Sequence, residues 1–221
     1  MVQEQVYRDN WKALQASGDV ILNDIASLKP ASTRPDLLTA CIFPTAEAAQ
    51  ALQRLSDELQ GDFPGQHYLP QDYYHCTLAA FGALQGEVFH DPAFPRLADI
   101  HAAMENILAG FKSFTLRLEG LNRFRNCVFV QVHDDSGTLH AINQQLTKQL
   151  ALKSPFAFIP HIALIYFKQD PLPLFARIEE RYRAIPLGSF SVSEIAITRW
   201  LQNRSTDKKA HRVLHTVSLF R

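Results

Sequence analysis

Apolar residues along the chain alternate between the spacing of strands and the spacing of helices. Apolar runs rich in β-branched and aromatic residues predict strands at 37–44, 75–81, 114–121, 127–133, 158–167, 190–200 and 212–220. Apolar residues three and four positions apart predict helices at 45–60, 98–110, 137–152 and 175–184. Thr45 is suited to cap the first of these helices. Strands interleaved with helices, some paired as hairpins, favour an α+β fold over a parallel doubly wound sheet.

The beginning of the chain follows a different pattern from the rest. A polar, helix-tending stretch is centred on residues 11–28, and Pro30 and Pro35 disfavour its continuation. We therefore expect an N-terminal helical extension at 1–36 and a folded domain at 37–221. The second half of that domain repeats the order of elements in the first, which suggests two related lobes.

Composition limits the classes of function. The chain has 221 residues, 47% of them hydrophobic, and its 22 basic and 22 acidic residues cancel. A globular core is therefore expected, without an overall field that would attract long nucleic acids or an anionic membrane. Three cysteines without C-x-x-C spacing argue against disulfides and a cysteine zinc site. A charged start and no long apolar run indicate a cytoplasmic protein with no membrane contact.

Two of the nine histidines lie in matching surroundings. The segments 75–81 and 161–167 share the frame H-x-x-L-x-x-F, and each falls in a predicted strand. Alternation along a strand places His75, Thr77, Ala79 and Phe81 on one face. If the two strands lie side by side about a pseudo-twofold axis, His75 and His161 project into one groove.

Two imidazoles in one groove suit phosphoryl chemistry. Because the pKa of imidazole lies near neutrality, His75 and His161 can share the work, one accepting a proton while the other donates one. The Thr77 hydroxyl, two residues after His75, could donate a hydrogen bond to a phosphate oxygen. This chemistry needs no metal ion.

These motifs resemble those of the two-histidine (2H) phosphoesterase superfamily, which includes the 2′-5′ RNA ligase-like RNA 2′,3′-cyclic phosphodiesterases. The family signature is a pair of H-x-[ST]-x motifs. Residues 75–78 match it, whereas residues 161–164 carry Ala163 in place of the hydroxyl residue. The resemblance extends over residues 37–220. It implies a bilobal, pseudo-twofold α+β fold with antiparallel-rich sheets, flanking helices and a cleft between lobes, in which one histidine is the base and the other the acid.

Several residues near the two motifs are candidate substrate contacts. Arg123 and Arg125 lie in the predicted turn at 122–126, where they could hold a nucleotide or simply form a solvated hairpin. Aromatic residues beside the motifs could line a wall for the base or belong to the core. The aromatic candidates are Tyr74, Phe81 and Tyr166.

Other histidines are weaker candidates for a metal site. His211 and His215 are four residues apart, which in a strand separates them by about 13 Å. His101 and Glu105 share a helix face, but the sequence shows no third ligand beside them. We therefore expect no metal site and no cofactor.

The sequence thus predicts a metal-independent phosphoesterase that hydrolyses a 2′,3′-cyclic phosphate at an RNA end or on a nucleotide. Its catalytic residues would be His75 and His161, with Thr77 on the phosphate. We expect a monomer and infer no stable protein partner. One alternative is a protein that binds phosphate ligands or RNA ends with little or no turnover, because Ala163 lacks the second hydroxyl. Another is a metal-dependent hydrolase that uses histidine ligands.

Overall fold

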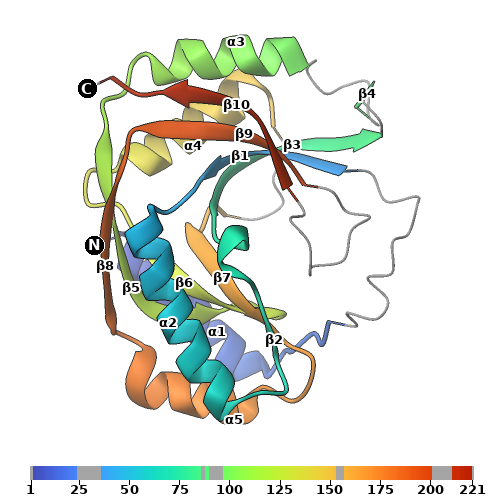
Figure 1. Ribbon diagram of the computed structural model, residues 1–221, viewed down its shortest axis with the longest axis vertical. Helices are drawn as coiled ribbons and strands as arrows, with labels where there is room; N and C mark the ends of the chain where they lie inside the picture. The colour runs from blue at the N-terminus through green and yellow to red at the C-terminus, as the bar shows by residue number, and fades with distance from the viewer. Residues whose placement is uncertain are drawn as a thin grey trace.

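The computed structural model describes residues 2–23, 36–85, 88–89, 97–152, 157–200 and 211–220 (Figure 1). Over these residues the chain alternates between helices and strands. The helices are α1 (Val2–Ser17), α2 (Ala46–Asp62), α3 (Leu97–Leu108), α4 (Thr138–Gln149) and α5 (Leu172–Arg177). The strands are β1 (Asp36–Ile42), β2 (His67–Tyr68), β3 (Cys76–Gln85), β4 (Val88–Phe89), β5 (Phe114–Arg123), β6 (Cys127–His133), β7 (His161–Tyr166), β8 (Pro186–Val192), β9 (Glu194–Trp200) and β10 (His211–Ser218).

All ten described strands belong to one sheet. Their order is β10-β9-β1-β3-β7-β6-β5-β8, with β2 paired to β7 and β4 paired to β3. Each of these strand pairs is antiparallel. The predicted α+β class, with an antiparallel sheet and flanking helices, is confirmed.

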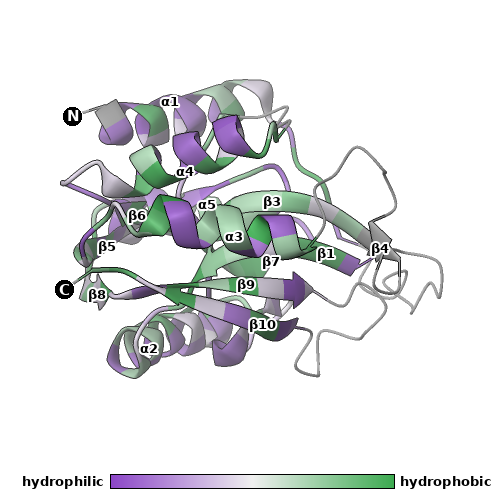
Figure 2. Ribbon diagram, turned by 90° about the horizontal axis from the view of Figure 1, so that it is seen from above, coloured by the Kyte–Doolittle hydropathy of each residue, from purple (hydrophilic) through white to green (hydrophobic). Residues whose placement is uncertain are grey.

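Two strand–helix–strand units meet in the middle of this sheet. In the first, α2 connects β1 to its neighbour β3 by way of β2, and in the second, α4 connects β6 to its neighbour β7. Helix α2 packs on β7 and β8, whereas α4 packs on β3. Strands β3 and β7 pair through Cys76 and Ile162. The two units thus contribute matching strands to the centre of the sheet, and Figure 2 shows α2 and α4 on opposite sides of these strands.

Helix α1 packs against β5 on the side of the sheet opposite α2 (Figure 2). Its Trp11 side chain is 95% buried, so this helix contributes to the core. The predicted helix over 11–28 is displaced, because the observed helix ends at Ser17 and residues 18–23 are not helical. Residues 24–28 lie outside the described part of the chain, and the domain boundary at residue 37 stays a prediction.

Most other predicted elements lie close to their observed positions. The Thr45 side chain caps α2 by accepting a hydrogen bond from the Ala48 N–H. The predicted strand over 190–200 is in fact the two strands β8 and β9, which pair with different neighbours and separate at Ser193. No helix among the described residues is long and apolar enough to cross a membrane.

Candidate functional site

The two histidine motifs face each other where β3 and β7 meet. Cys76 pairs with Ile162 in antiparallel register. Continuing that register by one residue in each direction places His75 opposite Ala163 and Thr77 opposite His161. All four side chains lie on the same face of the sheet, because they flank a pair that points the other way. The predicted juxtaposition of the two motifs is therefore present in the fold.

The same backbone hydrogen bond orients both imidazoles. His75 Nδ1 lies 2.6 Å from the carbonyl oxygen of Tyr73, and His161 Nδ1 lies 2.7 Å from that of Ile159. Since a carbonyl only accepts, Nδ1 carries the proton in each ring, and the neutral ring has its lone pair on Nε2. Each ring can accept a proton at Nε2 or, when protonated, donate one from there.

A bulge follows each histidine and changes which side chains share its face. The extra residue is Leu78 in β3 and Leu164 in β7, the equivalent leucines of the two frames. The carbonyl of Leu78 accepts a hydrogen bond from the Asn143 side chain (2.7 Å), and that of Leu164 from the Leu69 N–H (2.8 Å). Both bulges are therefore built into the packing around them.

In β3 the bulge at Leu78, together with a second register shift at Phe81, overturns the predicted alternation beyond Thr77. Ala79 and Phe81 were expected on the face of His75, but their side chains are buried, Phe81 completely. Ala80 is exposed instead. Phe81 therefore belongs to the core and does not reach the surface that carries the histidines, contrary to its prediction as a substrate contact.

Aromatic rings cover His75. Its ring centroid lies 4.1 Å from that of Trp200 and 6.4 Å from that of Phe43. The His211 ring stacks on Phe43 at 5.3 Å and lies 4.8 Å from Trp200. Phe43, Trp200 and His211 lie at the ends of β1, β9 and β10, so only the folded sheet brings them beside His75. No sequence motif marks them.

A second group of rings covers His161. Its centroid lies 4.8 Å from that of Phe124, in an edge-on arrangement, and 5.2 Å from that of Phe129. Phe124 occupies the β5–β6 turn, and Phe129 is paired with Ala163 across β6 and β7. Each histidine is thus partly buried among aromatic rings.

This burial changes the basicity of both rings. Loss of water is the main cause that lowers the pKa of His75 to about 4, and the charges of His161 and His211 lower it further. Burial also lowers the pKa of His161, whose hydrogen bond to Ile159 acts in the opposite direction. The effect of His161 on His75 shows that the two imidazoles interact electrostatically.

The hydroxyl position of the first motif is occupied, and that of the second is not. Thr77 is partly exposed, and its Oγ1 lies 3.9 Å from the buried Cys41 Sγ. Ala163 is also partly exposed. The face around the histidines therefore carries a hydroxyl beside His161 and a methyl group at the corresponding place beside His75.

Two other predicted contacts lie in the core. The Arg123 guanidinium is 4.0 Å from the Phe175 ring centroid, and Phe175 packs on Phe167, on the buried side of β7. Arg123 thus lies on the opposite face from His161, contrary to prediction. Tyr74 is also buried, and its hydroxyl hydrogen-bonds to Gln53 on α2.

The remaining two candidates reach the surface. Arg125 is exposed and forms an ion pair of 3.6 Å with Asp19. Tyr166 is partly exposed, and its ring is nearly parallel to that of His67 at 6.5 Å. The bulge at Leu164 places Tyr166 on the histidine face, so its role as a substrate contact stays a prediction.

Histidines of α3 and β10 form a separate group. The rings of His101 and His215 stack at 4.6 Å, and His215 Nε2 lies 3.4 Å from Glu105 Oε1. The structure thus brings a third side chain to the His101–Glu105 pair. Among the described residues, however, no three histidine, cysteine or acidic side chains are arranged to hold a metal ion.

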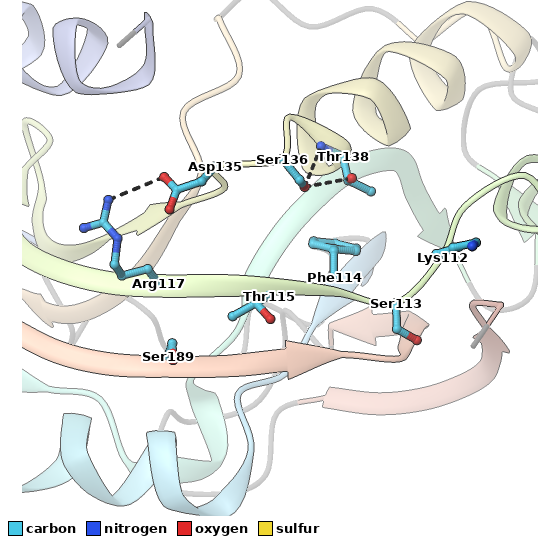
Figure 3. A pocket seen from close by; sticks show the side chains of 9 residues that line it. All are labelled: Lys112, Ser113, Phe114, Thr115, Arg117, Asp135, Ser136, Thr138 and Ser189. Atoms are coloured by element: carbon cyan, nitrogen blue, oxygen red, sulfur yellow. Dashed lines mark hydrogen bonds and ion pairs between the residues drawn. The ribbon is translucent and has the colours of Figure 1, made fainter.

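A polar hollow of about 530 Å³ lies away from the histidines, between β5, β8 and the start of α4 (Figure 3). Arg117 pairs with Asp135 at its edge, and Ser136 bonds with Thr138. A second hollow, of about 550 Å³, is lined by Phe43, by the start of α2 and by residues 71–74, and neither His75 nor His161 is among its lining residues.

Comparisons with known proteins identify relatives in sequence and in fold. The chain is 29% identical over 167 residues to the RNA 2′,3′-cyclic phosphodiesterase of Geobacillus stearothermophilus, covering 70% of this chain and 49% of that protein. It therefore spans about half the length of this curated relative.

Solved structures share the fold at low identity. TT0787 of Thermus thermophilus has a TM-score of 0.62 at 20% identity, covering 83% of this chain and 97% of the other. E. coli LigT in its apo form has a TM-score of 0.60 at 17% identity, covering 86% and 100%. The sequence profile of the 2′-5′ RNA ligase superfamily matches residues 75–204, more than half of the chain and both histidine motifs. The chain belongs to the 2′-5′ RNA ligase superfamily.

Proposed function

We propose that this protein is a cyclic phosphodiesterase that opens a 2′,3′-cyclic phosphate, at an RNA end or on a nucleotide. The observation that carries the proposal is the pair of imidazoles held in the same way across the Cys76–Ile162 pair. Each ring has its Nδ1 atom bound to the backbone and its Nε2 atom available for proton transfer. The cleft between two lobes that the resemblance implies would be the groove over this pair.

The chemistry follows from the two proton positions. His75, whose pKa is lowered to about 4, is neutral at neutral pH and accepts a proton from water at Nε2 while the water oxygen attacks phosphorus. The bond between phosphorus and one ribose oxygen breaks, and His161 donates its Nε2 proton to that oxygen. The product is a phosphate monoester beside a free ribose hydroxyl. A bound phosphate anion favours the protonated form of His161 by its charge.

Thr77 would donate a hydrogen bond to a phosphate oxygen beside His161. Its register opposite His161 supports that role. The nucleoside could stack on an aromatic ring beside the motifs, that of Trp200, Phe43 or Tyr166. A relative of the same fold, E. coli LigT, has been crystallised with 3′-AMP, a ribose phosphate of related chemistry.

The alternative is a protein that binds such phosphates without efficient turnover. Ala163 favours it, because one phosphate oxygen would lack a side-chain donor in the second motif. The loss of one hydrogen bond to a charged group costs about 1.5–3 kcal/mol, which slows a reaction without abolishing it. We therefore place hydrolysis first.

Incubation with defined substrates separates these functions. Purified protein is mixed with 2′,3′-cyclic AMP and with a short RNA that ends in a cyclic phosphate, each with and without EDTA, and the products are separated. We expect a monoester product at the same rate in both buffers. Binding without product would support the alternative, and product that disappears with EDTA would indicate a metal-dependent hydrolase.

A further inference from the structure

The hydroxyl of Tyr7 fills a break in the hydrogen-bond ladder next to His161. Strands β6 and β7 pair as far as Gln131 and His161. The next pair would join Val132 to Pro160, but proline has no N–H to donate. At this place the Tyr7 hydroxyl, from α1, lies 2.5 Å from the Pro160 carbonyl oxygen and accepts a hydrogen bond of 3.1 Å from the Val132 N–H.

The direction of the Tyr7 proton follows from its neighbours. The carbonyl oxygen of Val132 also lies within reach of Tyr7, at 2.9 Å, but it accepts a hydrogen bond of 2.5 Å from the Gln3 side chain. A hydroxyl has one proton to donate, and the shorter of the two contacts favours its donation to the Pro160 carbonyl oxygen. The Tyr7 side chain is 99% buried, and burial raises its pKa, so the hydroxyl keeps its proton.

This contact acts on the backbone that carries the histidine. The Pro160 carbonyl belongs to the peptide group that joins Pro160 to His161. The preceding carbonyl, that of Ile159, holds His161 Nδ1. Fixing the Pro160 peptide therefore fixes the direction from which the His161 side chain leaves the strand. The Tyr7 ring also lies 6.4 Å from that of Phe129, which covers His161.

Helix α1 is itself held firmly in place. Trp11 packs under the Arg183 guanidinium at 4.2 Å, and the Asn10 side chain donates to the Arg123 carbonyl at 2.7 Å. These contacts come from β5 and from the turn after Tyr182, and they anchor α1 on the C-terminal side of Tyr7. On its N-terminal side, the Gln3 side chain bonds to the Val132 carbonyl and to the Asp134 N–H. A rigid support of this kind is needed for a group that holds a proton donor within a fraction of an ångström.

We propose that Tyr7 is a positioning residue for His161, so that the N-terminal helix sets the geometry of proton transfer. The expected effect on turnover rests on the proposed function. The expected effect on the titration of the His161 ring does not. Tyr7→Phe removes the hydroxyl and keeps the ring. Tyr182→Phe is the matched control, since Tyr182 is also buried and its hydroxyl bonds to Glu58 on α2.

Two measurements test the proposal. In the first, the titration of His75 and His161 is followed by the NMR signals of their ring protons, assigned with His161→Gln. Tyr7→Phe should change the titration of His161 more than that of His75, which responds only through the charge of His161. In the second, Tyr7→Phe should lower kcat on 2′,3′-cyclic AMP about tenfold with KM within about twofold, because orientation affects the transition state more than binding.

Either of two results overturns it. One is an unchanged His161 titration in folded Tyr7→Phe, and the other is a kcat within about threefold of the Tyr182→Phe value in an active protein. A wild-type protein without turnover would refute the proposed function, and the NMR titration would still decide the role of Tyr7.

If Tyr7→Phe does not fold, Gln3→Ala takes its place, because the Val132 carbonyl without its Gln3 donor competes more strongly with Pro160 for the Tyr7 proton. Its control is Gln5→Ala, since Gln5 bonds to Asp9 on the same helix. A selective change at His161 is again expected, and no change overturns the proposal.

Discussion

Replacing Trp200 with alanine should restore much of the basicity of His75. The indole ring lies 4.1 Å from the imidazole, and loss of water is the largest cause of the low pKa of His75. An unperturbed imidazole has a pKa of about 6.5, against about 4 for His75 in the fold. Since Phe43 remains as partial cover, we expect Trp200→Ala to raise the pKa by about 1–2, a change of about 10- to 100-fold in proton affinity.

The measurement is an NMR titration of the His75 ring protons in wild type, Trp200→Ala and Trp200→Phe. The phenylalanine variant is the control, because it keeps an aromatic cover but loses the hydrogen bond from Trp200 Nε1 to Thr39. We expect its His75 pKa to stay near that of wild type. If the pKa in Trp200→Ala moves by less than about 0.3, burial under Trp200 is not the cause of the low basicity.

Three further outcomes follow from the same site. Thr77→Ala should lower kcat/KM about 10- to 150-fold, and Ala163→Ser should raise it, as measured on 2′,3′-cyclic AMP; two inert variants would mean that these positions do not contact phosphate. The pH profile of kcat/KM should be bell-shaped, rising as His75 loses its proton near pH 4 and falling as His161 loses its proton below pH 6.5. Limbs of the profile that do not coincide with the titrations of His75 and His161 would contradict the assignment of base and acid. Because burial depresses the pKa of His75 in the fold, the unfolded chain binds this proton more tightly than the folded chain does. The free energy of unfolding is therefore unaffected by His75 above pH 6.5 and falls by about 3 kcal/mol as the pH falls to about 4. Urea unfolding should therefore show less acid destabilisation in His75→Gln, and equal destabilisation in both proteins would refute this linkage.

The sequence carries the local signals of this site. The frame H-x-x-L-x-x-F occurs in two strands, and this repetition singles out His75 and His161. Alternation along the first of these strands correctly places Thr77 beside them. Both signals depend only on residues within one strand. That is why the α+β class and the pairing of the two motifs could be predicted before the fold was known.

The sequence could not predict the bulges in these strands or which side chains the core would bury. The bulges at Leu78 and Leu164 depend on partners elsewhere in the chain. In β3 the register shifts at Leu78 and at Phe81 leave the Phe81 side chain in the core. Arg123 resembled a phosphate contact by its position in a turn, but stacking on Phe175 stabilises its guanidinium in the interior. Such choices are made by tertiary packing, which overrides the local pattern.

The long-range contacts of the N-terminal helix could not be predicted from its sequence either. Its polar composition predicts a segment outside the domain, and one face of it nevertheless buries Tyr7 and Trp11. The contact of Tyr7 with Pro160 spans more than 150 positions of sequence. No local pattern connects a tyrosine at the start of the chain to a histidine in β7.

The most direct test of the account is the turnover of 2′,3′-cyclic AMP by His75→Ala, His161→Ala and the double variant. His140→Ala serves as the control, since His140 lies on α4 against Phe158. Both single variants should remain folded and retain less than about a tenth of the wild-type kcat, because general acid–base catalysis contributes at least about 100-fold. The double variant should be scarcely slower than either, since the two histidines serve one transition state. A single variant with more than about a tenth of wild-type turnover would contradict the paired-histidine mechanism.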